Sequence, residues 1–383
     1  MKFLHLSDLH LGKSLGEFDL IPDQRYFLER VLELIKEKDV NAVLIAGDVY
    51  DKSIPSEAAV NLLNWFVNEL ALLKKPAFII TGNHDSDERL NFASNLLEAR
   101  EIYICAKFDG RLYKRVLQDE FGPVNIWLLP FVKASQVRHF YPDETINNYE
   151  DAVRTVISHA DIDFEARNII LSHQFVAGHG KDPVLGGSEG LAAQSVGTIE
   201  VIGCSVFDGF DYAALGHIHS PQAVGREEVR YGGSPLKYSL SEVDNEKSLP
   251  IVTLKEKGKV EIELVKISPL RDLRHIKGPL KVLLENAKDQ EDFIYATLTD
   301  EDMVNDVMGI LQQTYPNTVK IDYENSHTKA LSDVELSGVV EDKSFDDLIR
   351  EFYLAMYGTE IDDEEMQIML DAAKEAGVIH EAD

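Results

Sequence analysis

Residues 41–51 read NAVLIAGDVYD, an apolar run that ends at Gly47 and is followed by Asp48 and Asp51. An uninterrupted apolar run bounded by glycine is typical of a strand buried on both faces, as in a parallel sheet. Around it lie helical patterns at 23–38 and 56–73 and strand patterns at 1–7 and 76–82. Strands that alternate with helices in this way predict a βαβαβ unit and a parallel sheet.

The pattern continues and then changes. Further strands are predicted at 125–130, 168–175 and 212–219, and from about 222 to 266 short strands alternate with turns. The short strands indicate a second sheet that is partly antiparallel. Two packed sheets with helices outside them make an α-β-β-α sandwich, so we predict a four-layer α/β core.

Three regions follow this core, which we assign to residues 1–268. Residues 269–326 show the order strand, helix, strand, helix, strand and predict a small separate α/β domain that caps the core. Residues 327–343 are polar without periodicity and indicate a linker. Residues 344–383 predict a helix-turn-helix tail with two apolar stripes. The stripes are Phe345, Leu348, Ile349, Phe352 and Met356, then Met366, Met369, Leu370 and Ala373.

Five short clusters of Asp, His and Asn come directly after predicted strands. They are Asp8-x-His10, Gly47-Asp48-x-x-Asp51, Gly82-Asn83-His84-Asp85, Ser172-His173 and Gly216-His217-x-His219. In open α/β sheets, sites form outside the carboxyl ends of the strands, so these clusters are expected to reach one crevice. A single such residue is most often a turn or cap residue, but an ordered set of five favours a common site.

The residue types indicate a metal centre. Residues i and i+2 of an extended segment point the same way, so Asp8 with His10, and His217 with His219, each aim two ligands at one point. Carboxylate, imidazole and amide oxygen together suit Mn, Fe or Zn. A carboxylate such as Asp48 is able to bridge two cations, and two cations ~3.5–4 Å apart clamp a phosphate and activate a water.

The order of these clusters resembles the calcineurin-like metallophosphoesterase superfamily over about residues 1–265. The resemblance implies two ligand sets, one of Asp8, His10, Asp48 and His219 and the other of Asp48, Asn83, His173 and His217. It also implies that His84 lies outside the metal ligands and acts on the leaving oxygen or on the transition-state charge. Asp51 would orient His84.

Within that superfamily, the chain is similar to the nuclease subunits of bacterial double-strand-break repair complexes, through its small second domain and the segment SFDDLIREFYLAMYG near the C-terminus. The similarity implies two divalent ions, Mn²⁺ by preference. It implies 3′→5′ exonuclease activity on duplex DNA and endonuclease activity on single strands and hairpins. It further implies a homodimer and a partner that is an SMC-like ABC ATPase with long coiled coils. We expect residues 344–383 to bind that ATPase, although packing on the chain's own body would also bury their stripes.

Two other functions stay open. A calcineurin-like esterase that acts on a small phosphodiester or on a phosphoprotein would share the core, but the domain at 269–326 favours a large substrate. A binding module with a decayed site would have lost ligands, whereas every expected ligand is present. Basic residues are candidates for contacts with DNA phosphates, although ordinary surface charge is the favoured explanation. These are Lys107, Arg111, Lys114, Arg115 and Lys237.

The helix at 57–73 is apolar around much of its circumference, which predicts burial on more than one side. The core explains one side and a dimer partner the other. The apolar positions are Leu62, Leu63, Trp65, Phe66, Leu70, Leu72 and Leu73.

Composition bounds the remaining possibilities. The 383 residues are 44% hydrophobic and carry a net charge of −29. Residues 331–383 alone hold 3 basic and 16 acidic residues. This acidic tail would repel DNA and would suit a basic surface on a partner. The alternative is that the charge only confers solubility. No apolar run reaches the ~18 residues of a membrane helix. The chain has two cysteines and no CxxC pair, and this low cysteine content indicates a reducing compartment, so we expect a cytoplasmic protein.

Overall fold

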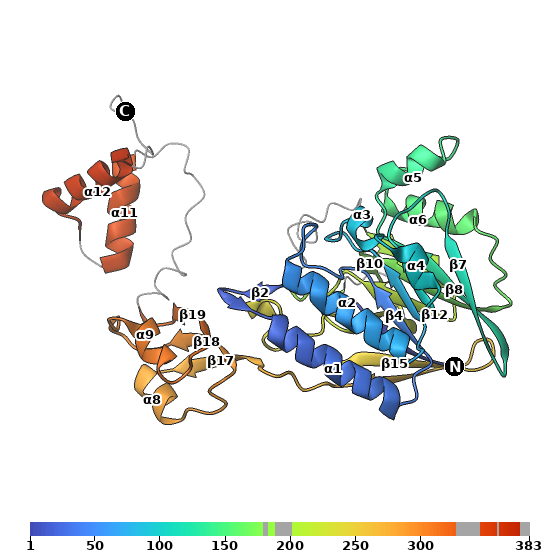
Figure 1. Ribbon diagram of the computed structural model, residues 1–383. Helices are drawn as coiled ribbons and strands as arrows, with labels where there is room; N and C mark the ends of the chain where they lie inside the picture. The colour runs from blue at the N-terminus through green and yellow to red at the C-terminus, as the bar shows by residue number, and fades with distance from the viewer. Residues whose placement is uncertain (179–182, 188–200, 327–344, 358–359, 376–383) are drawn as a thin grey trace. The chain divides into compact units, whose positions relative to one another are not determined.

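The structure is a computed structural model that describes residues 1–383 except 179–182, 188–200, 327–344, 358–359 and 376–383. The chain divides into two compact units, Met1–Leu273 and Arg274–Asp383 (Figure 1), and each is described by itself. In the described ranges, no helix has the length and apolar character needed to cross a membrane.

The first sheet of the larger unit has six strands in the order β16-β15-β1-β4-β5-β6. Strands β1 (Lys2–Leu6), β4 (Ala42–Ala46), β5 (Ala77–Ile80) and β6 (Ile102–Cys105) are parallel, as the alternating pattern predicts. Helices α1 (Ile21–Glu37) and α2 (Glu57–Leu72) run side by side over this sheet (Figure 1). Alternate strand residues such as Leu4 and Val43 pack against Phe27 and Phe66 of the helices.

The second sheet also has six strands, in the order β13-β14-β12-β9-β8-β7. Its parallel centre consists of β14 (Arg226–Tyr231), β12 (Tyr212–Gly216), β9 (Arg167–His173) and β8 (Gly122–Leu129). Strands β13 (Gln222–Val224) and β7 (Tyr113–Asp119) add antiparallel edges. Helices α5 (Ala134–Phe140) and α6 (Tyr149–Ser158) pack on one face through Val137 and Val153.

The other faces of the two sheets meet in a shared apolar core. Phe3 and Phe78 come from the first sheet, and Leu171 and Tyr212 from the second; all four are fully buried. Short elements complete the unit: β2 (Ser14–Leu15), β3 (Phe18–Asp19), α3 (Asp87–Leu90), α4 (Ser94–Glu98), β10 (Val176–Ala177), β11 (Ile202–Gly203), and the 3₁₀ turns η1 (Cys204–Phe207) and η2 (Leu240–Glu242). The mixed α/β fold with two sheets is therefore as predicted.

One part of the sequence prediction is wrong. The strands between 222 and 266 do not all belong to the second sheet, because β15 (Leu249–Leu254) and β16 (Val260–Val265) extend the first sheet beside β1. Strand β15 pairs antiparallel with β1, with Phe3 opposite Val252. Both side chains are buried in the core between the sheets. This packing stabilises β15 beside β1, and the sequence of β15 alone does not show which sheet it joins.

The smaller unit contains a three-stranded sheet in the order β17-β18-β19. Its elements follow the predicted order along the chain: β17 (Leu273–Gly278), α8 (Leu280–Glu285), β18 (Phe293–Leu298), α9 (Val307–Gln312) and β19 (Thr318–Tyr323). Its core is built from Ile294, Ala296, Leu298 and Leu311.

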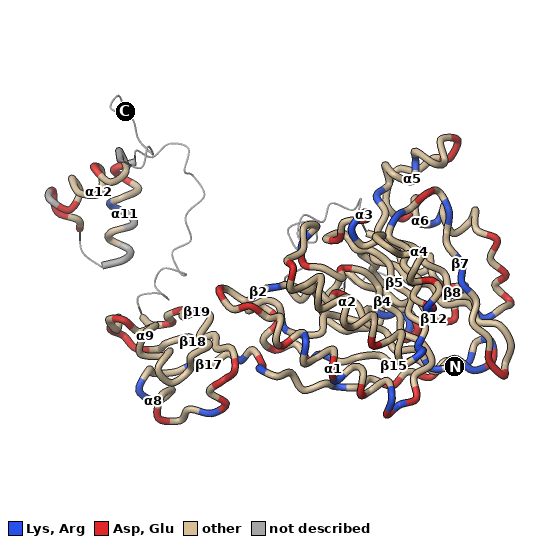
Figure 2. Tube along the Cα trace, viewed as in Figure 1, with Lys and Arg blue, Asp and Glu red and all other residues tan. Residues whose placement is uncertain are grey.

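Two further helices, α11 (Phe345–Tyr357) and α12 (Asp363–Glu375), share a small apolar cluster of Ile349 from α11, Met366 from α12 and Ile361, which precedes α12. Figure 2 shows acidic residues on both helices. Met369 of the predicted stripes is 39% exposed. The side chains of Phe345, Phe352 and Met356 lie outside the described residues.

Candidate metal centre

The five polar clusters lie at the carboxyl ends of β1, β4, β5, β9 and β12, and the structure brings them together. Two contacts join the two sheets at this edge. The backbone N–H of His217 donates to Oδ1 of Asp8 at 2.9 Å. Nδ1 of His173 donates to the carbonyl oxygen of Ala46 at 2.8 Å. Residues from both sheets therefore contribute to the predicted cluster.

Asp8, His10 and His219 form the first group of possible ligands, and their donor atoms lie within 4.8 Å of one another. All three side chains are buried. Nε2 of His10 and Nε2 of His219 are 3.1 Å apart. Oδ2 of Asp8 has no hydrogen-bond partner among the described residues, which is costly for a buried carboxylate oxygen. A cation among these atoms would satisfy the Asp8 oxygen.

Asp8, Asp48 and His173 form the second group. Oδ2 of Asp48 lies 3.3 Å from Nε2 of His173 and 3.5 Å from Nε2 of His10, so it lies between one histidine of each group. Two other predicted ligands adjoin this group. Oδ1 of Asn83 is 3.2 Å from Nε2 of His173 and 3.0 Å from Nδ1 of His217. The donor set of carboxylate, imidazole and amide oxygen suits a transition metal.

Backbone carbonyls fix the tautomers of two histidines. A carbonyl oxygen only accepts, so Nδ1 of His173 carries the proton that it donates to Ala46. In the neutral ring, Nε2 of His173 then has its lone pair on the side of Asp48 and Asn83. Nδ1 of His84 donates to the carbonyl oxygen of Asp51 at 3.0 Å in the same way, which leaves Nε2 of His84 available.

Burial and neighbouring charges shift the pKa values of the acids and histidines in this cluster. Burial raises the pKa of Asp8 and lowers that of His217 to about 3. Burial would also raise the pKa of Asp48, but His173 and His10 outweigh it and hold that pKa well below its usual range. Conversely, burial would lower the pKa of His173, but Asp48 outweighs it and raises the pKa to about 9. A cation binding here therefore competes with a proton on His173.

Several ligand candidates have left-handed backbone. The φ angles are 50° at Asp8, 42° at His10, 48° at Asp48 and 100° at His217. A residue other than glycine in this region costs on the order of 1–3 kcal/mol and persists where surrounding contacts impose it. Such residues cluster at functional sites, and here they lie where the chain leaves β1, β4 and β12.

The structure modifies the prediction for Asp51. His84 is oriented by the backbone carbonyl of Asp51 and not by its carboxylate. Oδ1 of that carboxylate instead pairs with Nζ of Lys13 at 2.9 Å and lies 3.7 Å from Nδ1 of His10. The backbone N–H of His84 donates to Oδ1 of Asp48 at 2.9 Å, and its ring meets the edge of the His10 ring. His84 therefore lies beside the ligand groups.

Asp85 has a role that the sequence did not suggest. Its carboxylate accepts hydrogen bonds from the backbone N–H groups of Val49, Tyr50 and Gly82, at 3.0, 2.9 and 2.9 Å. These bonds tie the loop after β4 to the loop after β5. Burial and the nearby Asp48 raise the pKa of Asp85 to about 6. The only sequence signal was its place directly after His84.

Four of the five basic candidates are engaged within the chain. Arg111 pairs with Asp109, Arg115 with Glu98, and Lys237 with Asp272 at 2.9 Å. The ammonium group of Lys114 lies over the Trp127 ring, and Lys107 is exposed. These internal partners favour the interpretation of these residues as ordinary surface charges.

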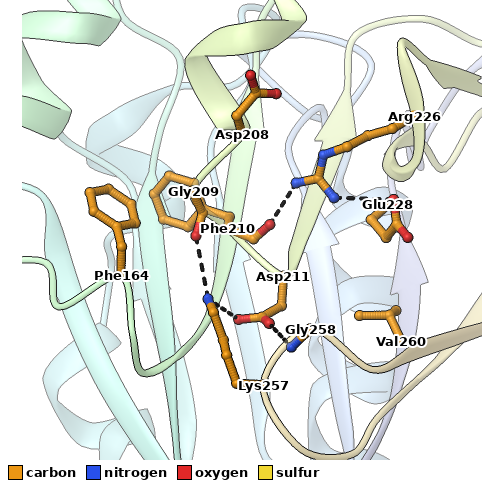
Figure 3. A pocket seen from close by; sticks show the side chains of 10 residues that line it. All are labelled: Phe164, Asp208, Gly209, Phe210, Asp211, Arg226, Glu228, Lys257, Gly258 and Val260. Atoms are coloured by element: carbon orange, nitrogen blue, oxygen red, sulfur yellow. Dashed lines mark hydrogen bonds and ion pairs between the residues drawn. The ribbon is translucent and has the colours of Figure 1, made fainter.

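A separate hollow of about 320 Å³ lies at the other end of β12 (Figure 3). Four of its charged side chains are paired within the chain. Lys257 pairs with Asp211 at 3.0 Å, and Arg226 binds Glu228 and the carbonyl oxygens of Phe207 and Phe210. Because four of its five charged side chains already have partners, this hollow is a weaker candidate for chemistry than the cluster of candidate ligands.

Comparison with known proteins agrees with this geometry. Residues 1–221 match the calcineurin-like phosphoesterase family. The chain belongs to this family. Residues 269–357 match the SbcD C-terminal domain family, described as the type 5 capsule protein repressor C-terminal domain. The two matches together support an SbcD-type nuclease subunit.

Solved structures with low similarity include Yfce, a phosphoesterase from E. coli, at 16% identity over 70% of this chain and 100% of that one, with a TM-score of 0.29. Another is a dimetal phosphatase from Danio rerio, at 12% identity over 70% of this chain and 99% of that one, with a TM-score of 0.36.

Proposed function

We propose that this metal-dependent phosphoesterase is a DNA nuclease that hydrolyses phosphodiester bonds with two divalent cations, Mn²⁺ by preference. The observation that carries the proposal is the position of Asp48, whose Oδ2 lies between Nε2 of His10 and Nε2 of His173. The proposed ligands of one ion are Asp8, His10, Asp48 and His219, and those of the other are Asp48, Asn83, His173 and His217.

Different residues of the chain have different proposed roles in hydrolysis. When bound, the two cations supply Lewis-acid activation of the phosphoryl group and of the attacking water. Asp48 holds the two ligand groups together and, through Oδ1, accepts the backbone N–H of His84. His84 keeps Nδ1 on the carbonyl of Asp51 and presents Nε2 to the leaving oxygen or to the transition-state charge. A positioned group of this kind contributes about 10²–10⁴-fold in rate.

DNA is the proposed substrate because the SbcD-type C-terminal domain follows the phosphoesterase domain. The proposed activities are 3′→5′ exonuclease action on duplex ends and endonuclease action on single strands and hairpins, in cytoplasmic double-strand-break repair and recombination. Hydrolysis of a small phosphodiester or of a phosphoprotein is the alternative, since the ligand groups alone would serve either substrate.

The proposed partner is SbcC, an SMC-like ABC ATPase. Leu354 and Ile368 on α11 and α12 are 49% and 64% exposed, and exposed apolar side chains on helices suit a groove on a partner. A homodimer through α2 is also proposed. Leu62, Phe66 and Leu70 face the core, whereas Leu72 is 75% exposed.

The test is a nuclease assay on linear duplex, single-strand and hairpin DNA with Mn²⁺, using the wild-type protein and Asp48→Asn. We expect the wild type to cut DNA and the variant to be inactive. Asp211→Asn is the matched control, because Asp211 is also a buried acid but lies at the other end of β12. Cleavage of a small phosphodiester without any cleavage of DNA would favour the alternative.

A further inference from the structure

Glu242 is a fully buried carboxylate behind the metal centre, 23 residues after His219 in the sequence. It ends the 3₁₀ turn η2. Its Oε1 lies 3.3 Å from Nδ1 of His219. The other nitrogen of that ring, Nε2, is the one that faces His10. The two nitrogens of His219 thus have different surroundings, a carboxylate on one side and the proposed ion on the other.

The second oxygen of Glu242 is held by a cation. Oε2 lies 2.5 Å from Nζ of Lys247 and 3.3 Å from Oγ of Ser234. The same Lys247 ammonium donates to Ser234 Oγ at 2.8 Å and to the backbone carbonyl of His219 at 2.9 Å. Glu242 therefore contacts the ring of His219, and Lys247 contacts its backbone carbonyl.

The electrostatics keep this carboxylate ionised. The ammonium group of Lys247 lies 2.5 Å from Oε2, and an opposite charge at this distance favours the charged form of the carboxylate. An ionised carboxylate only accepts, so Nδ1 of His219 must carry the proton. Nε2 of the neutral ring then keeps its lone pair for a cation. A carboxylate in this position also raises the basicity of the imidazole.

We propose that Glu242 is the positioning residue that holds His219 as an Nε2 ligand, with Lys247 balancing its charge. The inference rests on the proposed two-ion function and adds a residue that belongs to neither ligand group. It makes the two sides of the centre unequal. Nδ1 of His219 faces an anion, whereas Nδ1 of His173 faces the neutral carbonyl of Ala46. Loss of Glu242 should therefore weaken one ion and spare the other.

The test measures Mn²⁺ binding by the full chain after chelator treatment, using titration calorimetry, alongside denaturant unfolding. Wild-type protein is expected to bind two equivalents. Glu242→Gln keeps the volume but removes the charge. We expect it to weaken one equivalent by about 10–100-fold and to leave the other unchanged. Asp211→Asn is the matched control, because Asp211 is also buried and also pairs with a lysine, Lys257 at 3.0 Å. It should lose stability yet keep both equivalents.

A second variant guards against a failure to fold. In Glu242→Met with Lys247→Met, both charges are removed together, so no buried ion is left unpaired. This double variant should again weaken one equivalent. Unchanged binding of both ions by a folded variant would overturn the inference, and so would equal weakening of both, because a purely structural role predicts no preference. A wild-type protein that binds only one ion would refute the two-ion function, and the effect of Glu242→Gln on that ion would still decide the role of Glu242.

Discussion

A methyl group at Gly82 tests how closely the centre must be packed. A Cβ atom built on Gly82 would lie 2.1 Å from Oδ1 of Asp48 and 2.4 Å from its backbone nitrogen. Ordinary contact begins near 3.4 Å, so Gly82→Ala must displace the carboxylate oxygen, the loop, or both by about 1.3 Å. The displaced atom belongs to the residue that stands between the two ligand groups.

The expected cost follows from that displacement. A misplacement of about 1 Å in a reacting site costs on the order of 10²-fold in rate, so we expect at least that loss from Gly82→Ala. Overpacking should also lower the free energy of unfolding by about 1–3 kcal/mol. The assay is hydrolysis of a chromogenic phosphodiester with Mn²⁺, together with denaturant unfolding of the same preparation.

Gly258→Ala is the control for the loss of a glycine. Gly258 has φ +78°, and a Cβ there would meet nothing within 4 Å. Left-handed alanine costs roughly 1–2 kcal/mol, so this variant should lose similar stability but keep its activity. Wild-type activity in Gly82→Ala, or an equal loss of activity in both variants, would refute the steric argument.

Four further outcomes are expected. Asp48→Asn should abolish hydrolysis and lower metal content, because one substitution weakens both ligand groups; turnover at the wild-type rate would contradict the assignment. His84→Ala should slow hydrolysis about 10²–10⁴-fold while metal content, measured by elemental analysis, stays constant; a parallel loss of metal would make His84 a ligand. Chelators should inhibit, and Mn²⁺ should restore activity better than Mg²⁺, since Mg²⁺ prefers oxygen ligands to imidazole; equal rates in Mg²⁺ would argue against this. Deleting residues 335–383 should spare the cutting of short single strands but abolish co-purification with the ATPase, and full binding by the truncated protein would show that the tail is only structural.

The clustering of the candidate ligands was predictable because each of them lies at the carboxyl end of a strand. The glycine before Asp48 and the spacing of His217 and His219 are local features of the sequence. Parallel strands then carry such features to one edge of a sheet, so a local pattern is sufficient to predict a long-range cluster.

Supporting residues were not predictable for the opposite reason. Glu242 stands in the stretch SEVDNEK among other acids, and nothing local separates it from a surface residue. Only the fold places it against His219. The sheet partner of β15 was missed similarly, because a strand pattern defines a strand but not its neighbour. Asp51 shows a third limit, since its backbone carbonyl, and not the side chain visible in the sequence, contacts His84.

The proposed ligands come from two different sheets, and this affects how long the native state persists. His10 follows a strand of the first sheet and His219 a strand of the second, and 209 residues separate them in sequence. Under the proposed assignment, one ion ties these two positions together as a cross-link would. Clips that close long loops restrict the unfolded chain most, in the loop-closure account. Removal of the ions should therefore abolish activity and also remove this link between the two sheets. We expect thermal inactivation of the metal-free protein to be faster.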